Sequence, residues 1–90
     1  MDIYYVKLSS VGNPDFGEDS RKSVSPTEFH RCRSFAECSK ECKRYISMWD
    51  LGGGNWNGGQ IFNSCVQVAR VSFNGRIWKG TKWGEQEIVV

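Results

Sequence analysis

Long apolar segments are missing from this 90-residue sequence. No stretch approaches the roughly 18 consecutive apolar residues of a membrane-spanning helix, so we expect no membrane span. The opening residues MDIYYVKLSS also lack the basic start and the apolar run of a secretory signal. Four cysteines without such a signal favour free thiols in a reducing compartment. We therefore expect a cytoplasmic protein.

Residue combinations that carry catalysis are missing as well. The single histidine, His30, lies in a charged segment without an obvious orienting partner, which disfavours a nucleophile–base pair. Glu37 and Glu41 stand between basic residues, as expected for a helix cap and a solvated helix face. The glycine-rich stretch follows a helix and precedes a strand, so it matches no phosphate-binding motif. We predict no enzyme, no catalytic residue, no cofactor and no small-molecule substrate.

The composition is that of one ordinary globular domain covering residues 1–90. Hydrophobic residues make up 39% and charged residues 24% of the chain, and the net charge is only +2. That charge is too small to indicate a nucleic-acid partner by itself. Its distribution is uneven, however, with seven basic against three acidic residues in 21–44 and four against none in 65–83.

The order of patterns predicts an α+β fold. β-Branched and aromatic residues predict strands over 3–8 and, at a sheet edge, over 27–33. Ser34 and Glu37 form a capping box that predicts a helix from Phe35 to about Trp49. Its apolar stripe of Phe35, Cys38, Cys42, Tyr45 and Trp49, with Ile46 beside it, must pack on one sheet face. We therefore expect a two-layer β-β-α-β-β-β domain, with an antiparallel sheet of four to five strands and a last strand in 85–90.

Residues Cys65 to Lys79 predict a β-hairpin with Asn74-Gly75 as its two-residue turn. That turn sets Arg70 opposite Lys79 and Val71 opposite Trp78. Alternation then gives one face of Phe73, Val71, Ala69 and Trp78, which we predict to be the core face, and an outer face of Ser72, Ile77, Arg70 and Lys79. Like charges in direct opposition oppose folding slightly, so Arg70 and Lys79 become candidates for partner binding. The alternative is an ordinary charged, solvated face.

Three further features leave alternatives open. Cys32, Cys38, Cys42 and Cys65, with His30, have no paired C-x₂-C spacing, so buried free thiols are favoured over a zinc site and no metal is expected. The long connection 9–26 is predicted to be either mobile or a contact surface. Trp56, in the glycine-rich segment 52–59, would be either an exposed interface anchor or a side chain folded back onto the sheet.

The run PTEFHRCRSFAECSKECKRYI followed by CVQVARVSFNGRIWKG is the basis for a family resemblance. The pattern, with Ser34, Lys40, Val71, Asn74, Gly75, Trp78 and Lys79, resembles small phage-encoded anti-CRISPR proteins. The most similar are inhibitors of the type I-F surveillance complex, built on an antiparallel sheet with one helix. The resemblance implies a stoichiometric inhibitor in the host cytoplasm that binds a Cas subunit of the guide-RNA complex and blocks target DNA. The implied partner-binding residues are Arg70, Lys79, Arg76, Lys82, Trp56 and Trp83.

Two other functions remain open from the residues themselves. Basic residues interleaved with Trp78, Trp83 and Tyr45 are compatible with a nucleic-acid-binding module, whose affinity would fall steeply with salt. A protein adaptor or inhibitor with another host target would carry the same surface features.

Overall fold

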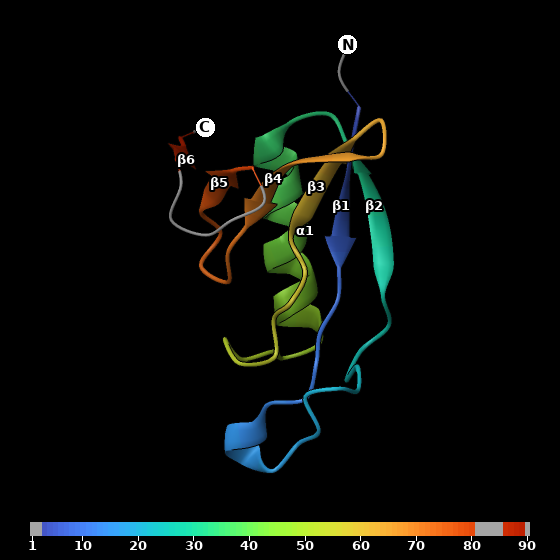
Figure 1. Ribbon diagram of the computed structural model, residues 1–90, viewed down its shortest axis with the longest axis vertical. Coiled ribbons are helices and arrows are strands. Elements are labelled where there is room, and N and C mark those ends of the chain that lie inside the picture. Colours follow the sequence, from blue (N-terminus) through green and yellow to red (C-terminus); the bar gives the residue numbers. More distant parts are fainter. Residues whose placement is uncertain (1–2, 81–85, 90) are drawn as a thin grey trace.

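One helix lies on one face of a six-stranded antiparallel sheet (Figure 1), which confirms the α+β prediction with six strands in place of four to five. The computed structural model describes residues 3–80 and 86–89. The strand order in the sheet is β2-β1-β3-β4-β5-β6. The elements are β1 Tyr4–Leu8, a 3₁₀ turn Pro14–Phe16, β2 Glu28–Cys32, α1 Phe35–Met48, β3 Gln60–Asn63, β4 Val66–Val71, β5 Ile77–Lys79 and β6 Glu87–Ile88.

The helix begins at the predicted cap. Ser34 Oγ accepts the Glu37 N–H at 3.1 Å, whereas the Glu37 carboxylate accepts the N–H of Arg33, one residue before the cap, at 3.0 Å. The helix ends at Met48, and Asp50, which follows the C-cap residue Trp49, adopts a left-handed φ of 51°. There the Leu51 N–H donates to Ile46 O and the Asp50 N–H to Ser47 O, the pairing of a Schellman motif. Among the described residues, no helix is long and apolar enough to cross a bilayer.

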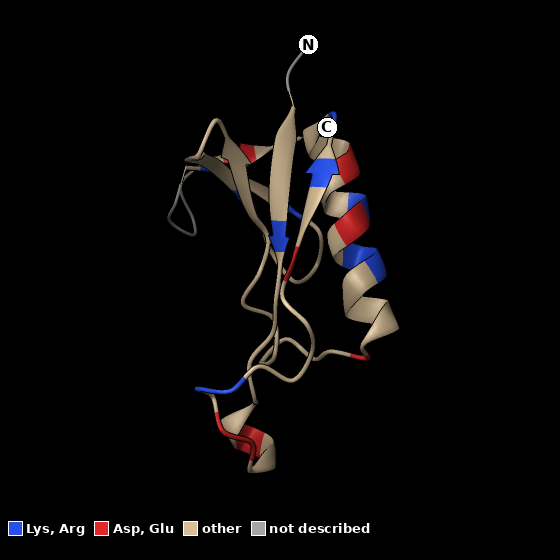
Figure 2. Ribbon diagram, turned by 90° about the vertical axis from the view of Figure 1, so that its right-hand side faces the viewer, with Lys and Arg blue, Asp and Glu red and all other residues tan. Residues whose placement is uncertain are grey.

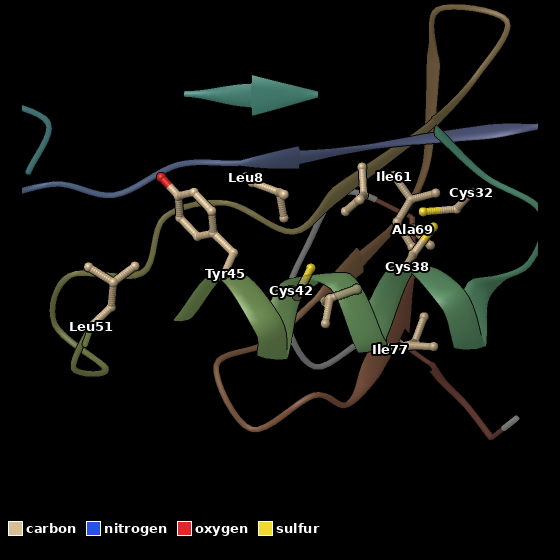
Figure 3. Close-up of a cluster of buried hydrophobic side chains, with 11 residues drawn as sticks. Leu8, Cys32, Cys38, Cys42, Tyr45, Leu51, Ile61, Ala69 and Ile77 are labelled. Atoms are coloured by element: carbon tan, nitrogen blue, oxygen red, sulfur yellow. The ribbon is translucent and has the colours of Figure 1, made fainter. Parts of the chain in front are cut away.

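The core lies between α1 and the sheet face that α1 covers. Cys38, Cys42 and Tyr45 are fully buried, so most of the predicted stripe is confirmed, but Trp49 is 41% exposed because the helix has already ended at Met48. Figure 3 shows the helix side chains against those of the strands. The strands contribute Val6, Leu8, Ile61, Ala69, Val71 and Ile77.

The predicted hairpin exists, but its register was wrong by one residue. Val71 pairs with Ile77, Arg70 with Trp78 and Ala69 with Lys79. The turn contains three residues rather than two, since the Ser72 N–H donates to Arg76 O and Gly75 takes a φ of 87°. A one-residue slip turns every side chain of one strand to the other face. Ile77 therefore enters the core at 2% exposure, and Trp78 lies on the opposite face.

The long connection 9–26 is fastened to the rest of the molecule. Ser10 forms an antiparallel bridge with Trp56, and the Val11 N–H donates to Asn55 O at 2.8 Å. The Asn55 side chain donates to Val11 O and to the Glu18 carboxylate. In Figure 1 this connection and its 3₁₀ turn form the end of the molecule far from the N-terminus.

Candidate binding surface

We call the sheet face opposite α1 the open face. Within residues 3–80 and 86–89, no second layer of secondary structure covers it. Strand alternation places on it the residues between the buried ones, and the observed registers align them in cross-strand rows. In β1 these are Tyr5 and Lys7, which alternate with the buried Val6 and Leu8. The other open-face residues are Phe29 and Arg31 on β2, Gln60 and Phe62 on β3, Arg70 on β4 and Trp78 on β5.

Three aromatic residues form a patch on this face, which we call the aromatic patch. Tyr5 is directly opposite Phe62, and the ring centroids of Phe29 and Phe62 are 6.4 Å apart. Phe29 is 61% and Tyr5 45% exposed, although burial would be the normal state of such rings. With Cys65 they line a shallow hollow of about 370 Å³. The patch is therefore apolar, accessible and concave.

Two cations border the aromatic patch. Lys7 is directly opposite Phe29, and Arg31 is directly opposite Tyr5, so each cation is the cross-strand neighbour of an aromatic ring. Figure 2 shows basic positions on the neighbouring strands β1 and β2, while acidic and basic positions alternate along α1. Apolar rings and positive charges thus lie side by side on the open face, so that one bound molecule could contact both.

The structure separates the residues that the sequence had grouped as a basic pair. Arg70 is opposite Trp78 and Gln60, not Lys79, and partial burial lowers the pKa of its guanidinium. Lys79 is an exposed neighbour of Ala69, and Arg76 is exposed in the turn. The proposed repulsion between Arg70 and Lys79 is therefore absent. Lys82 and Trp83, the remaining basic and aromatic candidates of this region, lie outside the described residues.

Trp56 follows the second of its two predicted alternatives and folds back. Its indole N–H donates to Val71 O at 3.2 Å, and its ring centroid is 6.1 Å from that of Tyr45. The bulk of the ring is thus used to connect the glycine-rich segment with the core. Trp56 therefore does not belong to the open face of the sheet.

A cluster of possible metal ligands lies between β2 and α1. One ligand atom each of His30, Cys32 and Glu37 lies within 4.8 Å of the others. Burial raises the pKa of the Cys32 thiol, and the nearby Glu37 and Glu41 charges raise it further. This environment is the opposite of the one that activates a cysteine nucleophile. Cys38 and Cys42 are also buried free thiols, and Cys65 is exposed.

The sequence did not predict the aromatic patch, because the partner-binding residues were chosen mainly from the positions of basic residues. The signal was present in the alternation of the second strand, in which Phe29, Arg31 and Arg33 share one side. Tyr5 alternates in the same way with the apolar Val6. The cross-strand pairings that bring Tyr5, Phe29 and Phe62 together join segments more than 20 residues apart, so no local pattern reports them.

No protein-family model, no curated protein and no solved structure matches the chain.

Proposed function

We propose that this chain is a non-enzymatic binding protein and that the open face is its interaction surface. The observation that carries the proposal is the aromatic patch of Tyr5, Phe29 and Phe62, bordered by Lys7 and Arg31. Exposed aromatic rings beside arginine are typical of the residues that dominate binding energy at protein interfaces. The fold needs neither the exposure of these rings nor the adjacent charge.

The partner that we propose is a Cas subunit of a type I-F surveillance complex, with target DNA binding as the step that is blocked. Two observations support this choice of partner. The segment order resembles that of phage-encoded inhibitors, and the open face carries cations and rings that suit binding to a protein subunit at its DNA-binding site. Rings can occupy apolar pockets of the subunit, and Lys7 and Arg31 can pair with its acidic groups. This role places the protein in the host cytoplasm.

Target-DNA binding by the purified complex tests this proposal. Excess protein should abolish the binding of a labelled target duplex. Phe29→Ala and Arg31→Ala should each raise the concentration needed for inhibition about tenfold or more. Phe16→Ala and Lys40→Ala are matched controls, because Phe16 is 79% exposed on the distant 3₁₀ turn and Lys40 is exposed on α1. The controls should inhibit like the unchanged protein.

Two results would contradict the proposal in different ways. Unchanged DNA affinity at excess protein would exclude this target. Normal inhibition by Phe29→Ala and Arg31→Ala would instead place the interface elsewhere.

A second candidate function is direct binding of single-stranded nucleic acid. The observation that favours it is the cross-strand pairing of Lys7 with Phe29 and of Arg31 with Tyr5. Bases stack on aromatic side chains at about 1–3 kcal/mol each, and adjacent cations hold the phosphates. Tyr45 does not contribute as the sequence suggested, since it is fully buried.

Fluorescence anisotropy with labelled single strands, without any Cas protein, separates this candidate from the first. Two phosphate contacts predict a slope of about −1.4 in a plot of log affinity against log salt. Phe29→Ala should weaken binding at every salt concentration, whereas Arg31→Ala should also reduce the slope. Absence of binding at low salt removes the candidate.

A further inference from the structure

The inner side of the edge strand β2 faces the first turn of α1 and brings three different donor types together. His30 and Cys32 are two positions apart and therefore point to the same face of the strand. Glu37 belongs to the first helical turn, whose position is set by the Ser34 cap. Nitrogen, sulfur and oxygen donors from two elements thus converge on one place.

The separation of these donors is close to that of a metal site. The three ligand atoms lie within 4.8 Å of one another. In a tetrahedral zinc site, with bonds of about 2.0–2.3 Å, donor atoms are about 3.5 Å apart. The difference is at most about 1.3 Å for any pair. Rotations of the His30 and Glu37 side chains can remove it, because both are only partly buried.

Neighbouring groups already orient two of the three side chains. The Glu37 carboxylate accepts the Arg33 N–H at 3.0 Å through Oε2, which leaves Oε1 available. The His30 ring nitrogen Nε2 is 3.6 Å from Glu41 Oε1, and Arg44 Nε holds that carboxylate through Oε2 at 2.6 Å. A carboxylate beside the imidazole is the usual orienting partner of a metal-binding histidine.

The charges of the three donors suit a half-buried divalent cation. One thiolate and one carboxylate neutralise the two positive charges of Zn²⁺, and neutral imidazole adds none, so the loaded site carries no uncompensated charge. Access is open on one side, because Glu37 lines a surface hollow of about 540 Å³ together with Ile3, Arg31 and Arg33. The Glu37 end of the cluster is therefore open to solvent, whereas the Cys32 sulfur lies at its buried end.

We propose that His30, Cys32 and Glu37 bind one zinc-class divalent ion, which joins the edge strand β2 to the start of α1. On binding, the Cys32 S–H bond breaks, a sulfur–metal bond forms, and the proton leaves to solvent. A water molecule fills the fourth position, as in other three-ligand sites. The sequence disfavours a zinc site because its cysteines lack paired C-x₂-C spacing, and it marks Glu37 as a helix-cap residue rather than a ligand.

Titration of the reduced, metal-free protein with Co²⁺ tests the proposal. The background is Cys65→Ser, which removes the exposed thiol as an adventitious ligand. We expect saturation at one equivalent, with a thiolate-to-cobalt charge-transfer band and the visible bands of tetrahedral cobalt. Zn²⁺ should displace Co²⁺, and at about a hundredfold excess over its dissociation constant it should raise the melting temperature by roughly 10–20 °C.

Variants of the ligands and of a neighbour define the site. His30→Gln and Glu37→Gln should each weaken binding about 100-fold or more, since loss of a mere orienting partner already costs 10–100-fold. Glutamine at position 37 retains an acceptor for Arg33, and both residues are partly exposed, so these variants should fold. Cys42→Ala is the matched control, because it removes a buried thiol of the same core without touching the three ligands. It should bind Co²⁺ like the background protein.

Three results would overturn the proposal. The first is absence of saturable Co²⁺ binding. The second is binding that His30→Gln and Glu37→Gln leave unchanged, which would mean ligation by thiols alone. The third is loss of binding in Cys42→Ala while circular dichroism shows that this variant is folded.

Discussion

Tyr45 connects the helix with the long connection 9–26 through its hydroxyl group. The ring is fully buried, and its centroid lies 6.5 Å from that of Trp49 and 6.1 Å from that of Trp56. The hydroxyl donates to Pro26 O at 2.5 Å and lies 2.6 Å from Ser25 Oγ, which in turn lies 2.5 Å from Ser10 Oγ. A chain of polar groups therefore passes through an otherwise apolar region, where every member needs its partner.

Tyr45→Phe should lower the free energy of unfolding by about 1–3 kcal/mol, because Ser25 Oγ and Pro26 O lose a buried partner while the packing volume is nearly kept. Urea unfolding measures this loss, and hydrogen exchange should show weaker protection in residues 9–26. Tyr5→Phe is the matched control on the open face and should change stability by less than about 0.5 kcal/mol. Equal losses in both variants would show that the Tyr45 hydroxyl has no special role.

The hairpin shows what local pattern can and cannot predict at the scale of an element. Asn74-Gly75 marks the correct place for the reversal, because the turn needs a positive φ at Gly75. However, two-residue turns and three-residue turns with a bulge both use glycine at such a position, so the signal does not decide the loop length. The number of residues in the loop determines on which face of the sheet each side chain of β5 lies. The deciding factor was burial of Ile77 beside Val71, which is a property of the assembled core.

The glycine-rich segment 52–59 contains glycines that the close approach of the sheet requires, such as Gly59, and at least one that it does not require, Gly53. Gly59 donates its N–H to Lys7 O at 2.7 Å and accepts the Val71 N–H at 2.9 Å, so it joins β1 to the end of β4. Its φ is 95°, and a Cβ there would lie 2.1 Å from Val71 O. Gly53 has neither constraint, since a Cβ would meet only the Phe73 ring at 3.7 Å.

Gly59→Ala should therefore lower stability by about 3 kcal/mol or more, through the left-handed backbone and the clash with backbone atoms of β4. Gly53→Ala should be neutral or raise stability by up to about 1 kcal/mol, since it reduces the entropy of the unfolded chain. Thermal unfolding of the two variants side by side measures the difference. A loss in Gly53→Ala as large as that in Gly59→Ala would contradict this account.

At the scale of the whole molecule, the sequence predicted one face of the sheet better than the other. The helix-covered face follows from periodicity: the stripe of α1 and the alternation of β4 put Ala69 and Val71 in the core as expected. The open face depends on which strands are neighbours and on register. β3, which no strong pattern marked, places Phe62 opposite Tyr5 and so completes the aromatic patch. The periodicity of single elements therefore predicts the two layers of the fold, whereas the candidate site depends on pairing between strands that are far apart in the sequence.

The three buried thiols give the whole molecule a specific response to alkaline pH. Burial raises the pKa of the Cys42 thiol well above its ordinary value of 9.0, and the Cys32 and Glu41 charges act in the same direction. The folded state therefore keeps the thiol proton at pH values where the unfolded chain has lost it. The stabilising contribution is complete below about pH 9 and decreases as pH rises toward the folded pKa, by about 1.4 kcal/mol per pH unit and thiol.

Metal-free protein in urea, compared between about pH 8 and pH 10, measures this response. Cys42→Ala should be less stable than the unchanged protein at pH 8, because it leaves a cavity, but this difference should shrink by about 1.4 kcal/mol at pH 10. A constant difference between Cys42→Ala and the unchanged protein would mean that the Cys42 thiolate is tolerated in the folded core, and that this core admits water.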